Sequence, residues 1–326
     1  MPSTSVVIVT YNSQDVIGPC LESCLAAGLT SLVVVDNRST DGTVAEVHRF
    51  PSVHLIENPV NRGFAAAVNQ GAAELDSDFI LLLNPDARLQ NPVQPLCEAA
   101  ALAGASCGQL QNADGTPQRG FTFRRLPSTL ALAFEVLGIN RFWPSNPVNK
   151  NYRCLNADLS VPADVEQPAG AFLMVRRDVW DTLGGMDEQF HPVWFEDVDL
   201  CFRLRENGFH IRYLPFVKAF HMGGHSAGRI AWECRQRYWY ASLLRYAAMH
   251  AGPFSFRLLC LAVLVGATPR LSTGIRREGS TVAIASWFEV VRLAGSYMLR
   301  RRVASAVPSV SRQTHRFTKT STGTRA

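Results

Sequence analysis

The sequence predicts an α/β fold in which a mostly parallel sheet carries helices on both faces. Residues 79–83 are five apolar residues in a row, too few for a typical helix, and Asn84-Pro85 ends the run. This profile is typical of a parallel strand that is buried on both faces. Segments of strand and helix length also alternate through the first ninety residues, which is the pattern of a doubly wound sheet.

Each element of this first half is predicted by its local pattern. Residues 14–27 place apolar side chains at helical spacing, and Ser-Thr-Asp-Gly at 39–42 is typical of a helix start. No Gly-x-Gly-x-x-Gly follows the first strand, which disfavours a nicotinamide-dinucleotide fold. The expected elements are strand 5–10, helix 14–27, strand 32–35, helix 43–50, strand 53–56, helix 63–75 and strand 79–83.

The second half of the chain is less regular. Residues 112–116 predict a tight hairpin turn. Residues 126–165 combine weak patterning with prolines and glycines, and we expect a mobile connection near the functional site. The later elements are expected to be strand 169–175, helix 178–183 ended by Gly184-Gly185, helix 198–207 ended by Gly208, strands 211–214 and 217–221, and helix 231–250.

Composition predicts a globular protein of a reducing compartment. Hydrophobic residues make up 47% of the 326 residues, enough for a sizeable core. The eight cysteines include no Cys-x-x-Cys pair, which argues against a zinc site and for the cytoplasm. Residues 1–5 lead directly into the first strand without a basic segment, so no signal peptide is expected.

Charge is divided unevenly along the chain. The net charge is +5, but residues 251–326 contain 12 of the 32 basic and only 2 of the 27 acidic residues. Two apolar runs, 258–269 and 279–288, lie among these arginines. Twelve residues fall short of the roughly 20 needed to span a membrane, so we expect helices that lie on an anionic membrane surface, and no nucleic-acid partner. The alternative is a pair of core helices packed on the domain.

The predicted organisation therefore has three parts. A catalytic α/β domain is expected over residues 1–250, and a helical membrane-associating region over 251–305. The Ser/Thr/Arg-rich tail, 306–326, is expected to be disordered.

Polar residues occur where the expected strands end. Asp86 directly follows strand 79–83, although Asn-Pro-Asp is also ordinary turn chemistry. Ligands of open α/β sheets bind at the carboxyl ends of the strands. Four polar clusters are expected at this edge, so a nucleotide-diphosphate site is favoured over loop capping. The clusters are Thr10-Tyr11-Asn12, Asp36, Asn61-Arg62-Gly63 and Asp86. We expect Asp86 to hold a hard cation, Asp36 to accept the N3–H of a pyrimidine, and Arg62 to bind the diphosphate. The other candidate substrate contacts are Thr10, Tyr11, Asn12, Asn61 and Asn84.

A second acidic cluster opens the expected helix 198–207. Capping needs one acid, but Glu196, Asp197 and Asp199 supply three. The helix dipole is expected to keep their pKa values low. Trp194 and Phe195, just before them, are expected to form a floor on which a sugar stacks.

Six sequence motifs follow one another along the chain. They are V-V-I-V-T-Y-N-S, V-V-V-D-N-R-S-T-D-G-T, N-R-G-F-A-A-A-V-N, L-L-L-N-P-D-A, A-G-A-F-L-M-V-R-R and W-F-E-D-V-D-L-C-F-R. In this order they resemble family 2 glycosyltransferases, and most of all the bacterial rhamnosyltransferase-like enzymes of cell-surface polysaccharide assembly. The resemblance covers residues 5 to about 250. It implies a GT-A fold with a Rossmann-like sheet, a nucleotide-sugar donor, inversion at the anomeric carbon, and Mg²⁺ or Mn²⁺ held by Asp86.

The resemblance also implies residue roles. The family's base-reading aspartate corresponds to Asp36, and its general base to Asp197. Its metal- or diphosphate-binding histidine corresponds to His221, with His225 as the competitor. The metal motif here has one carboxylate where the fuller form has two. Beside these, Glu196 is expected to cap or orient, and Asp199 to bind acceptor hydroxyls.

The predicted function is transfer of a sugar, with dTDP-rhamnose as the expected donor, to a glycan or polyprenyl-linked acceptor. The enzyme is expected to be cytoplasmic and peripheral on the inner face of the cell membrane. A nucleotidyl- or phosphate-transfer enzyme is the first rival, but residues 10–18 contain none of the lysine that it would need. A non-catalytic nucleotide-sugar-binding subunit is the second; it could keep Asp36 and Asp86 but would not need Glu196-Asp197.

Overall fold

The computed structural model of the chain describes residues 3–224, 228 and 230–299. Nine strands form one mixed sheet in the order β3-β2-β1-β4-β10-β6-β11-β5, and β8 pairs with β11. β7 and β9 form a separate two-stranded pair. The strands are β1 Thr4–Thr10, β2 Ser31–Asp36, β3 Val53–Glu57, β4 Phe79–Leu83, β5 Ala87–Leu89, β6 Gly104–Gln111, β7 Phe123–Arg124, β8 Ala163–Val165, β9 Gln167–Pro168, β10 Phe172–Arg176 and β11 His210–His221.

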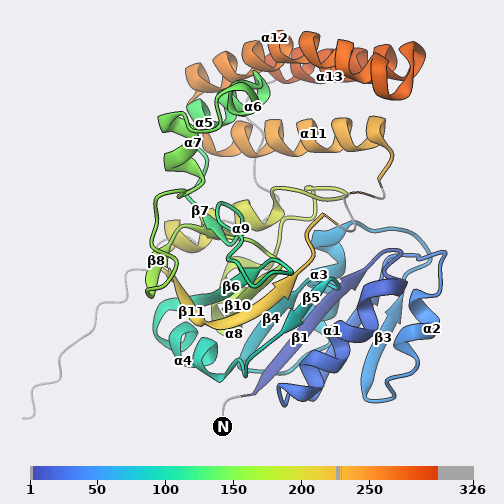
Figure 1. Ribbon diagram of the computed structural model, residues 1–326, viewed down its shortest axis with the longest axis vertical. Coiled ribbons are helices and arrows are strands. Elements are labelled where there is room, and N and C mark those ends of the chain that lie inside the picture. Colours follow the sequence, from blue (N-terminus) through green and yellow to red (C-terminus); the bar gives the residue numbers. More distant parts are fainter. Residues whose placement is uncertain (1–2, 225–227, 229, 300–326) are drawn as a thin grey trace, which may run out of the picture.

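Helices cover both faces of this sheet, as the sequence predicts (Figure 1). Their bounds are α1 Gln14–Ala26, α2 Thr43–Val47, α3 Phe64–Ala73, α4 Gln94–Ala103, α5 Thr129–Val136, α6 Ile139–Phe142, α7 Pro147–Tyr152, α8 Arg177–Leu183, α9 Glu196–Glu206, α11 Trp232–His250, α12 Pro253–Glu278 and α13 Ser280–Leu299.

The central strands are sorted into two cores by the alternation of their side chains. Val6 and Ile8 of β1 face α1 and α4, whereas Val7 and Val9 face α3 and the α8–α9 layer. Successive strand residues point to opposite faces, so a strand that is buried on both faces must be apolar throughout. This is why the apolar run of β4 was readable in the sequence.

β1, β2, β3 and β4 are mutually parallel, and their carboxyl ends therefore meet at one edge. β1 and β2 end in register, with Thr10 beside Asp36. β10 runs antiparallel between β4 and β6, which makes the sheet mixed. The predicted α/β sheet is confirmed, but it is mixed and not mostly parallel, because four of its strand pairings are parallel and four are antiparallel.

Strands β5 and β6 were missed by the sequence prediction. β6 reads G-A-S-C-G-Q-L-Q, which has neither alternation nor an apolar run, yet all eight residues are buried. A Cβ at Gly108 would lie 2.5 Å from the carbonyl oxygen of Val217, so only glycine lets β11 approach. This segment is a strand because it pairs with the distant strands β10 and β11, and not because of its local propensity.

Three further expectations differ from the structure. Residues 126–165 are not a mobile connection, because they form α5, α6 and α7 before β8. Residues 211–221 form one strand, β11, whose register with β6 shifts between Leu214 and Lys218. The C-terminal apolar runs extend into two long helices, and Pro269 lies inside α12 instead of ending it.

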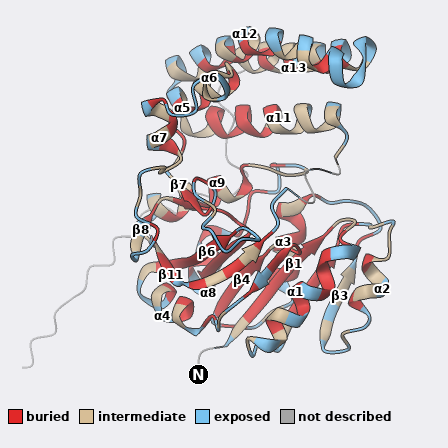
Figure 2. Ribbon diagram, in the orientation of Figure 1, coloured by how far each residue is buried: buried red, intermediate tan, exposed pale blue. Residues whose placement is uncertain are grey.

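The last three helices form a separate layer over the α/β unit (Figure 1). They share a third core, to which α11 contributes Leu243 and Leu244, and α12 contributes Leu259 and Val263. Figure 2 shows buried and exposed residues interleaved along α12 and α13, as expected for helices with one covered face. By length and composition both helices could cross a membrane, and 33% and 22% of their most apolar windows are buried.

Candidate active site at the carboxyl edge of the sheet

Asp36 lies at the end of β2 and is held by three uncharged donors. Its Oδ1 accepts from the Thr10 hydroxyl at 2.8 Å and from the Ser39 hydroxyl at 2.5 Å, and its Oδ2 accepts from the Ser39 N–H at 2.8 Å. A carboxylate has about four acceptor sites, so capacity for a further donor remains. Thr10 is fully buried and fixes Asp36 in place.

The loops after β1 and β2 are linked through Asn12. Its side-chain oxygen accepts from the Thr40 N–H at 2.7 Å, and its own N–H donates to the Ser39 hydroxyl at 2.8 Å. Asn12 has a φ of 52°, a left-handed conformation that asparagine tolerates. Asn12 thus shapes the loop, while the neighbouring Tyr11 remains partly exposed.

The Asn61-Arg62-Gly63 turn opens α3 beside these loops. The Asn61 side chain accepts from the Gly63 N–H at 2.9 Å, and the buried Asn37 donates to the Gly63 carbonyl at 3.1 Å. Arg62 is exposed, and within the described residues its guanidinium has no ion-pair partner. The turn therefore presents a free cation next to Asp36. Sequence reasoning missed Asn37, which follows Asp36 directly and anchors the turn.

The same turn contacts the segment that precedes α9. The Phe64 N–H donates to the Pro192 carbonyl at 2.7 Å, and His191 Nδ1 lies 3.2 Å from the Arg62 carbonyl. Gly63 has a φ of 85°, and a Cβ there would lie 2.7 Å from His191 Nδ1. Only glycine therefore fits this turn.

Asp86 and His221 face each other at the neighbouring strand ends. His221 Nε2 lies 3.4 Å from Asp86 Oδ1, and Asp86 Oδ2 accepts from the Gly223 N–H at 3.1 Å. Burial opposes ionisation of Asp86, but the adjacent His221 and backbone N–H groups outweigh it and hold the pKa of Asp86 below its ordinary value. Asp86 is therefore ionised, which is the form that binds a cation.

The imidazole of His221 is oriented for a ligand. Gln118 Oε1 lies 3.0 Å from His221 Nδ1, and the Phe121 ring stacks on the imidazole at 5.2 Å. In the tautomer whose Nδ1–H donates to Gln118, Nε2 carries a lone pair that is available to a cation, whereas the tautomer or imidazolium with a proton on Nε2 presents that proton to Asp86. Nε2 is buried and has no hydrogen-bond partner among the described residues. An imidazole nitrogen and a carboxylate oxygen that face each other in this way fit a divalent cation.

These two side chains are the metal-ligand candidates at this edge. In the part of the chain that the structure describes, no three His, Cys, Asp or Glu side chains gather around a possible ion. The competitor His225 lies outside the described residues.

Asp197 lies close to the Asn84–Asp86 turn. Its Oδ2 accepts from the Gly170 N–H at 3.0 Å, and its Oδ1 accepts from the Val198 N–H at 2.8 Å. The residue after Gly170, Ala171, accepts from the Asn84 N–H at 3.1 Å. A short chain of backbone contacts thus links the acidic start of α9 to the turn that holds Asp86.

The predicted low pKa values of the acidic cluster are wrong for Glu196 and Asp197. Burial raises the pKa of Asp197, although the N–H groups of Gly170 and Val198 oppose it. Burial and the neighbouring Asp197 raise the pKa of Glu196 well above its ordinary range. A helix N-terminus contributes about 0.3–1 kcal/mol, whereas desolvating a carboxylate costs several kcal/mol, so burial decides.

Asp199 and Phe195 differ from their predicted roles. Asp199 has no exposed surface, and its oxygens accept from Arg203 Nε at 2.7 Å and His250 Nε2 at 2.8 Å. In contrast to the prediction, it does not reach the side where an acceptor would bind. Phe195 is buried and packs on Tyr246, so it is not a floor for a sugar. Trp194 is partly exposed.

Arg124 is a site residue that sequence reasoning missed. Its Nε donates to the Gly120 carbonyl at 2.7 Å, and its guanidinium lies over the Phe121 and Tyr152 rings. Its charge acts against the raised pKa of Asp197. The only signal was a Phe-Arg-Arg run within a weakly patterned segment.

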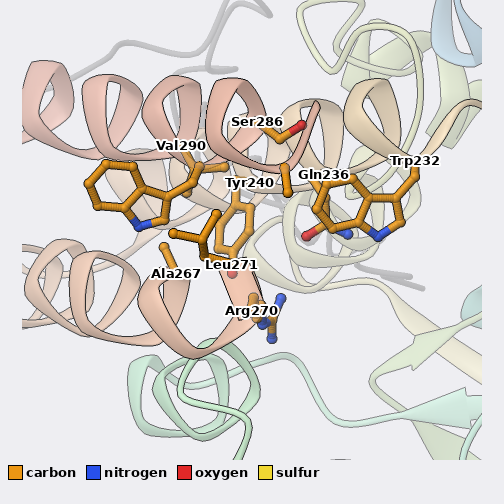
Figure 3. Close-up of a pocket in the computed structure, with 10 residues that line it drawn as sticks. Trp232, Gln236, Tyr240, Ala267, Arg270, Leu271, Ser286 and Val290 are labelled. Atoms are coloured by element: carbon orange, nitrogen blue, oxygen red, sulfur yellow. The ribbon is translucent and has the colours of Figure 1, made fainter. Parts of the chain in front are cut away.

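A small cavity lies elsewhere, between α11, α12 and α13 (Figure 3). Figure 3 shows Tyr240, Leu271 and Arg270 beside one another in it. Its volume of about 20 Å³ suits a water molecule, which would satisfy the Tyr240 hydroxyl that has no partner among the described residues. A nucleotide sugar needs a site of roughly 300–1,000 Å³, so this cavity is not the donor site.

Solved structures share the fold of this chain. A GalNAc-T7 structure with UDP, GalNAc and Mn²⁺ matches with a TM-score of 0.55 at 13% identity, over 88% of this chain and 54% of that one. The mannosyltransferase PcManGT from Pyrobaculum calidifontis, in complex with GDP-Man and Mn²⁺, matches with a TM-score of 0.51 at 16% identity, over 91% and 85%. The GT-A fold is thereby confirmed.

Relatives in sequence agree with the resemblance. The N-acetylglucosaminyl-diphospho-decaprenol L-rhamnosyltransferase of Mycobacterium tuberculosis is 32% identical over 250 residues, which cover 69% of this chain and 77% of the relative. The rhamnosyltransferase WbbL of Escherichia coli is 25% identical, over 74% of this chain and 92% of the relative.

Family models agree as well. Residues 5–147 match the model "Glycosyl transferase family 2", and residues 150–246 match "Glycosyltransferase like family 2". Together with the identity to the decaprenol rhamnosyltransferase, these matches identify the protein at the level of its family: the chain belongs to glycosyltransferase family 2 and is a rhamnosyltransferase-like glycosyltransferase.

Proposed function

We propose that the chain is an inverting glycosyltransferase that transfers rhamnose from dTDP-rhamnose to a hydroxyl of a polyprenyl-linked or polysaccharide acceptor in cell-surface glycan synthesis. The names of the M. tuberculosis and E. coli relatives support the sugar, and the first also supports a polyprenyl diphosphate acceptor. The observation that carries the proposal is the chain of backbone contacts that joins Asp197 to the turn of Asp86.

The donor would lie along the carboxyl ends of β1, β2 and β4. Asp36 would accept the N3–H of thymine with its remaining lone pair, and Tyr11 would lie beside the base. Arg62 would bind the diphosphate through its guanidinium, because the Gly63 and Phe64 N–H groups at the start of α3 already donate to Asn61 and Pro192. Asn61 and Asn12 would act by shaping their loops, and Asn84 by fixing the position of Asp86.

Asp86 and His221 would hold a divalent cation, Mg²⁺ or Mn²⁺, whose charge would stabilise the diphosphate leaving group. The orphaned Nε2 of His221 supports this assignment. Both GT-A structures named above contain Mn²⁺ according to their descriptions.

Asp197 would act as the general base. It would take the proton from the acceptor hydroxyl as that oxygen attacks the anomeric carbon, on the face opposite the diphosphate. The new bond forms to the acceptor oxygen while the bond to the diphosphate oxygen breaks. A single displacement without an enzyme nucleophile inverts the anomeric centre. Glu196 and Trp194 would line the acceptor side.

The C-terminal layer would hold the enzyme on the inner face of the cytoplasmic membrane. Exposed apolar side chains recur along one face of α12, at Phe254, Leu258, Leu261 and Val265. Exposed arginines, among them Arg257 and Arg276, flank this face. An apolar stripe with cationic edges suits the interface of an anionic bilayer, where a lipid-linked acceptor is found.

A transfer assay tests the proposed function. The full-length protein is incubated with dTDP-, UDP- and GDP-sugars and an N-acetylglucosaminyl diphosphate on a short polyprenol, and NMR reads the product anomer. We expect release of dTDP from dTDP-rhamnose and a product inverted relative to the donor. Retention would exclude the direct displacement. Tight nucleotide-sugar binding without turnover on any donor would instead support a non-catalytic subunit.

A further inference from the structure

Residues 187–199, which lead into α9, contact α11 at both of their ends. At its start, Asp187 Oδ2 accepts from Arg245 Nη2 at 2.7 Å. At its end, Asp199 Oδ1 lies 2.8 Å from His250 Nε2. All four side chains are at most 12% exposed. The two contacts therefore bracket residues 187–199, which include Asp197.

Further contacts, between these two ends, hold the rest of residues 187–199 on α11. The Ser242 hydroxyl donates to the Val193 carbonyl at 3.2 Å, and the Arg245 guanidinium lies 5.3 Å from the centre of the Phe190 ring. The ring of Phe195 lies 5.5 Å from that of Tyr246. Ser242, Arg245, Tyr246 and His250 occupy positions i, i+3, i+4 and i+8 of α11, so these groups form one face of the helix.

The backbone of the segment needs such a support. Trp194 has a φ of 81° and Phe195 a φ of 71°, two consecutive non-glycine residues in the left-handed region. Each costs on the order of 1–3 kcal/mol and persists only where the surroundings impose it. The strained pair lies directly before Glu196 and Asp197, so its relaxation would move the proposed base.

The Asp187–Arg245 ion pair is poorly explained by stability alone. Arg245 keeps a buried Nε–H without a partner among the described residues. Buried ion pairs are often no more stabilising than apolar residues of the same volume. α11 also shares a hydrophobic core with α12, to which Leu244 of α11 and Val263 of α12 contribute. α11 thus lies between the membrane-associating helices and the catalytic segment.

We propose that Arg245 and His250 are positioning residues that hold the 187–199 segment, and with it Asp197, in place for the acceptor. This inference rests on the proposed role of Asp197 as the general base. Neither residue is proposed to touch substrate. Both act from α11 on the geometry of the acceptor side and leave the donor side at β1, β2 and β4 unchanged.

His250 offers the cleaner test, because Asp199 keeps Arg203 as a partner when the imidazole is removed. In His250→Leu we expect kcat to fall about 10²-fold, the effect of an ångström-scale displacement of a catalytic group, while the Kd for dTDP-rhamnose stays within twofold. In His250→Gln the amide N–H replaces Nε2 as the donor to Asp199 and should restore most of the lost kcat. His48→Leu, at an exposed histidine on the far end of α2, is the matched control.

The contact between Asp187 and Arg245 is tested by removing both charges together. Asp187→Asn with Arg245→Met leaves no unpaired buried charge, so the protein should keep its thermal midpoint within a few degrees. We expect kcat to fall at least tenfold with unchanged donor affinity. A purely structural role would leave kcat unchanged in this folded double variant.

The outcomes separate this inference from the proposed function. If the wild type transfers no sugar, or if Asp197→Asn is fully active, the proposed function or base fails first. If Asp197→Asn is inactive but His250→Leu and the Asp187→Asn, Arg245→Met variant turn over normally, only the positioning role is overturned. Equal loss of kcat in His250→Leu and His250→Gln would also contradict it, because the donor contact would then not matter.

Discussion

Asp86 and Asp197 differ in their surroundings at the scale of single side chains. Asp86 faces an imidazole nitrogen, whereas Asp197 is held by two backbone N–H groups. A carboxylate beside an imidazole nitrogen is suited to metal binding, and one whose burial raises its pKa is suited to accept a proton. Substitutions at these two positions should therefore separate donor binding from turnover.

Asp197→Asn should lower kcat by about 10²- to 10⁴-fold with nearly unchanged donor affinity. The amide oxygen can still accept from the Gly170 N–H, which keeps the link to that segment, while the charge and the hydrogen bond from the Val198 N–H are lost. Single-turnover rates and calorimetric titration with the donor measure the two quantities. Asp199→Asn is the comparison, and if it alone loses turnover, the base lies two residues later.

Asp86→Ala should differ from Asp197→Asn, because donor affinity should fall along with activity. A chelator should inactivate the wild type, and added Mg²⁺ or Mn²⁺ should restore it. Calorimetry of Mn²⁺ binding, with and without dTDP, reads the site independently of turnover. Full activity in excess chelator would remove the metal role and leave Asp86 as a turn residue.

Glu196 should make the protein less stable as the pH rises. Its folded-state pKa lies well above the ordinary value of about 4.3, so the folded protein binds this proton more tightly than the unfolded chain. The corresponding stability is complete below the ordinary pKa and is lost as the pH rises through the raised one. Thermal midpoints from pH 5 to 8 should therefore decline less in Glu196→Gln than in the wild type, and identical slopes would contradict this.

At the scale of elements, close backbone approach fixes how α12 docks on the domain. A Cβ at Gly266 would lie 2.1 Å from the Val136 carbonyl oxygen at the end of α5. Arg270, one turn further on, donates to the Glu135 carbonyl at 2.8 Å. α12 thus packs on α5 through Gly266, and part of its apolar run is buried in the core.

Gly266→Ala should destabilise the protein by about 1–3 kcal/mol, because the new methyl group forces α12 away from α5. Gly295 in α13 is the matched control, since nothing lies within 4 Å of a Cβ there. Gly295→Ala should be neutral or stabilising by up to about 1 kcal/mol. Thermal unfolding of the two variants measures the difference, and equal midpoints would show that the α12–α5 contact yields easily.

At the scale of the whole molecule, the C-terminal layer is both a core and a surface. Its inner face completes the third core with α11, and its outer face exposes an apolar stripe. Removing the chain after Gly252 is therefore not the clean truncation that the sequence suggests, because it would uncover Leu243 and Leu244 of α11. Membrane association is better tested in the full chain.

Leu258→Asp and Val265→Asp should each weaken binding to anionic vesicles by about tenfold, since a buried aliphatic side chain is worth roughly 1.5–3 kcal/mol. Binding of the wild type should also weaken with salt. Leu102→Asp, at a fully exposed leucine on α4, is the control. Flotation with phosphatidylglycerol vesicles measures the binding of the wild type and of the three variants. Equal flotation of all variants would place the membrane contact elsewhere.

The first half of the sheet and the order of the site motifs could be predicted from the amino-acid pattern. Strands β1, β2 and β4 are buried on both faces, and a run of apolar residues that ends in a polar one is visible without tertiary information. Because parallel strands end at one edge, Asp36 and Asp86 could be placed together from their positions alone.

The strands and side-chain roles of the second half depend on contacts between distant residues. β6 has no local strand signal, and its burial between β10 and β11 comes from distant residues. Asp197 and Asp199 are two residues apart and look alike in sequence. Asp199 becomes a buried partner of His250, fifty-one residues away, whereas Asp197 faces Gly170. The role of a carboxylate depends on its desolvation and partners, and these are set by packing that local sequence does not encode.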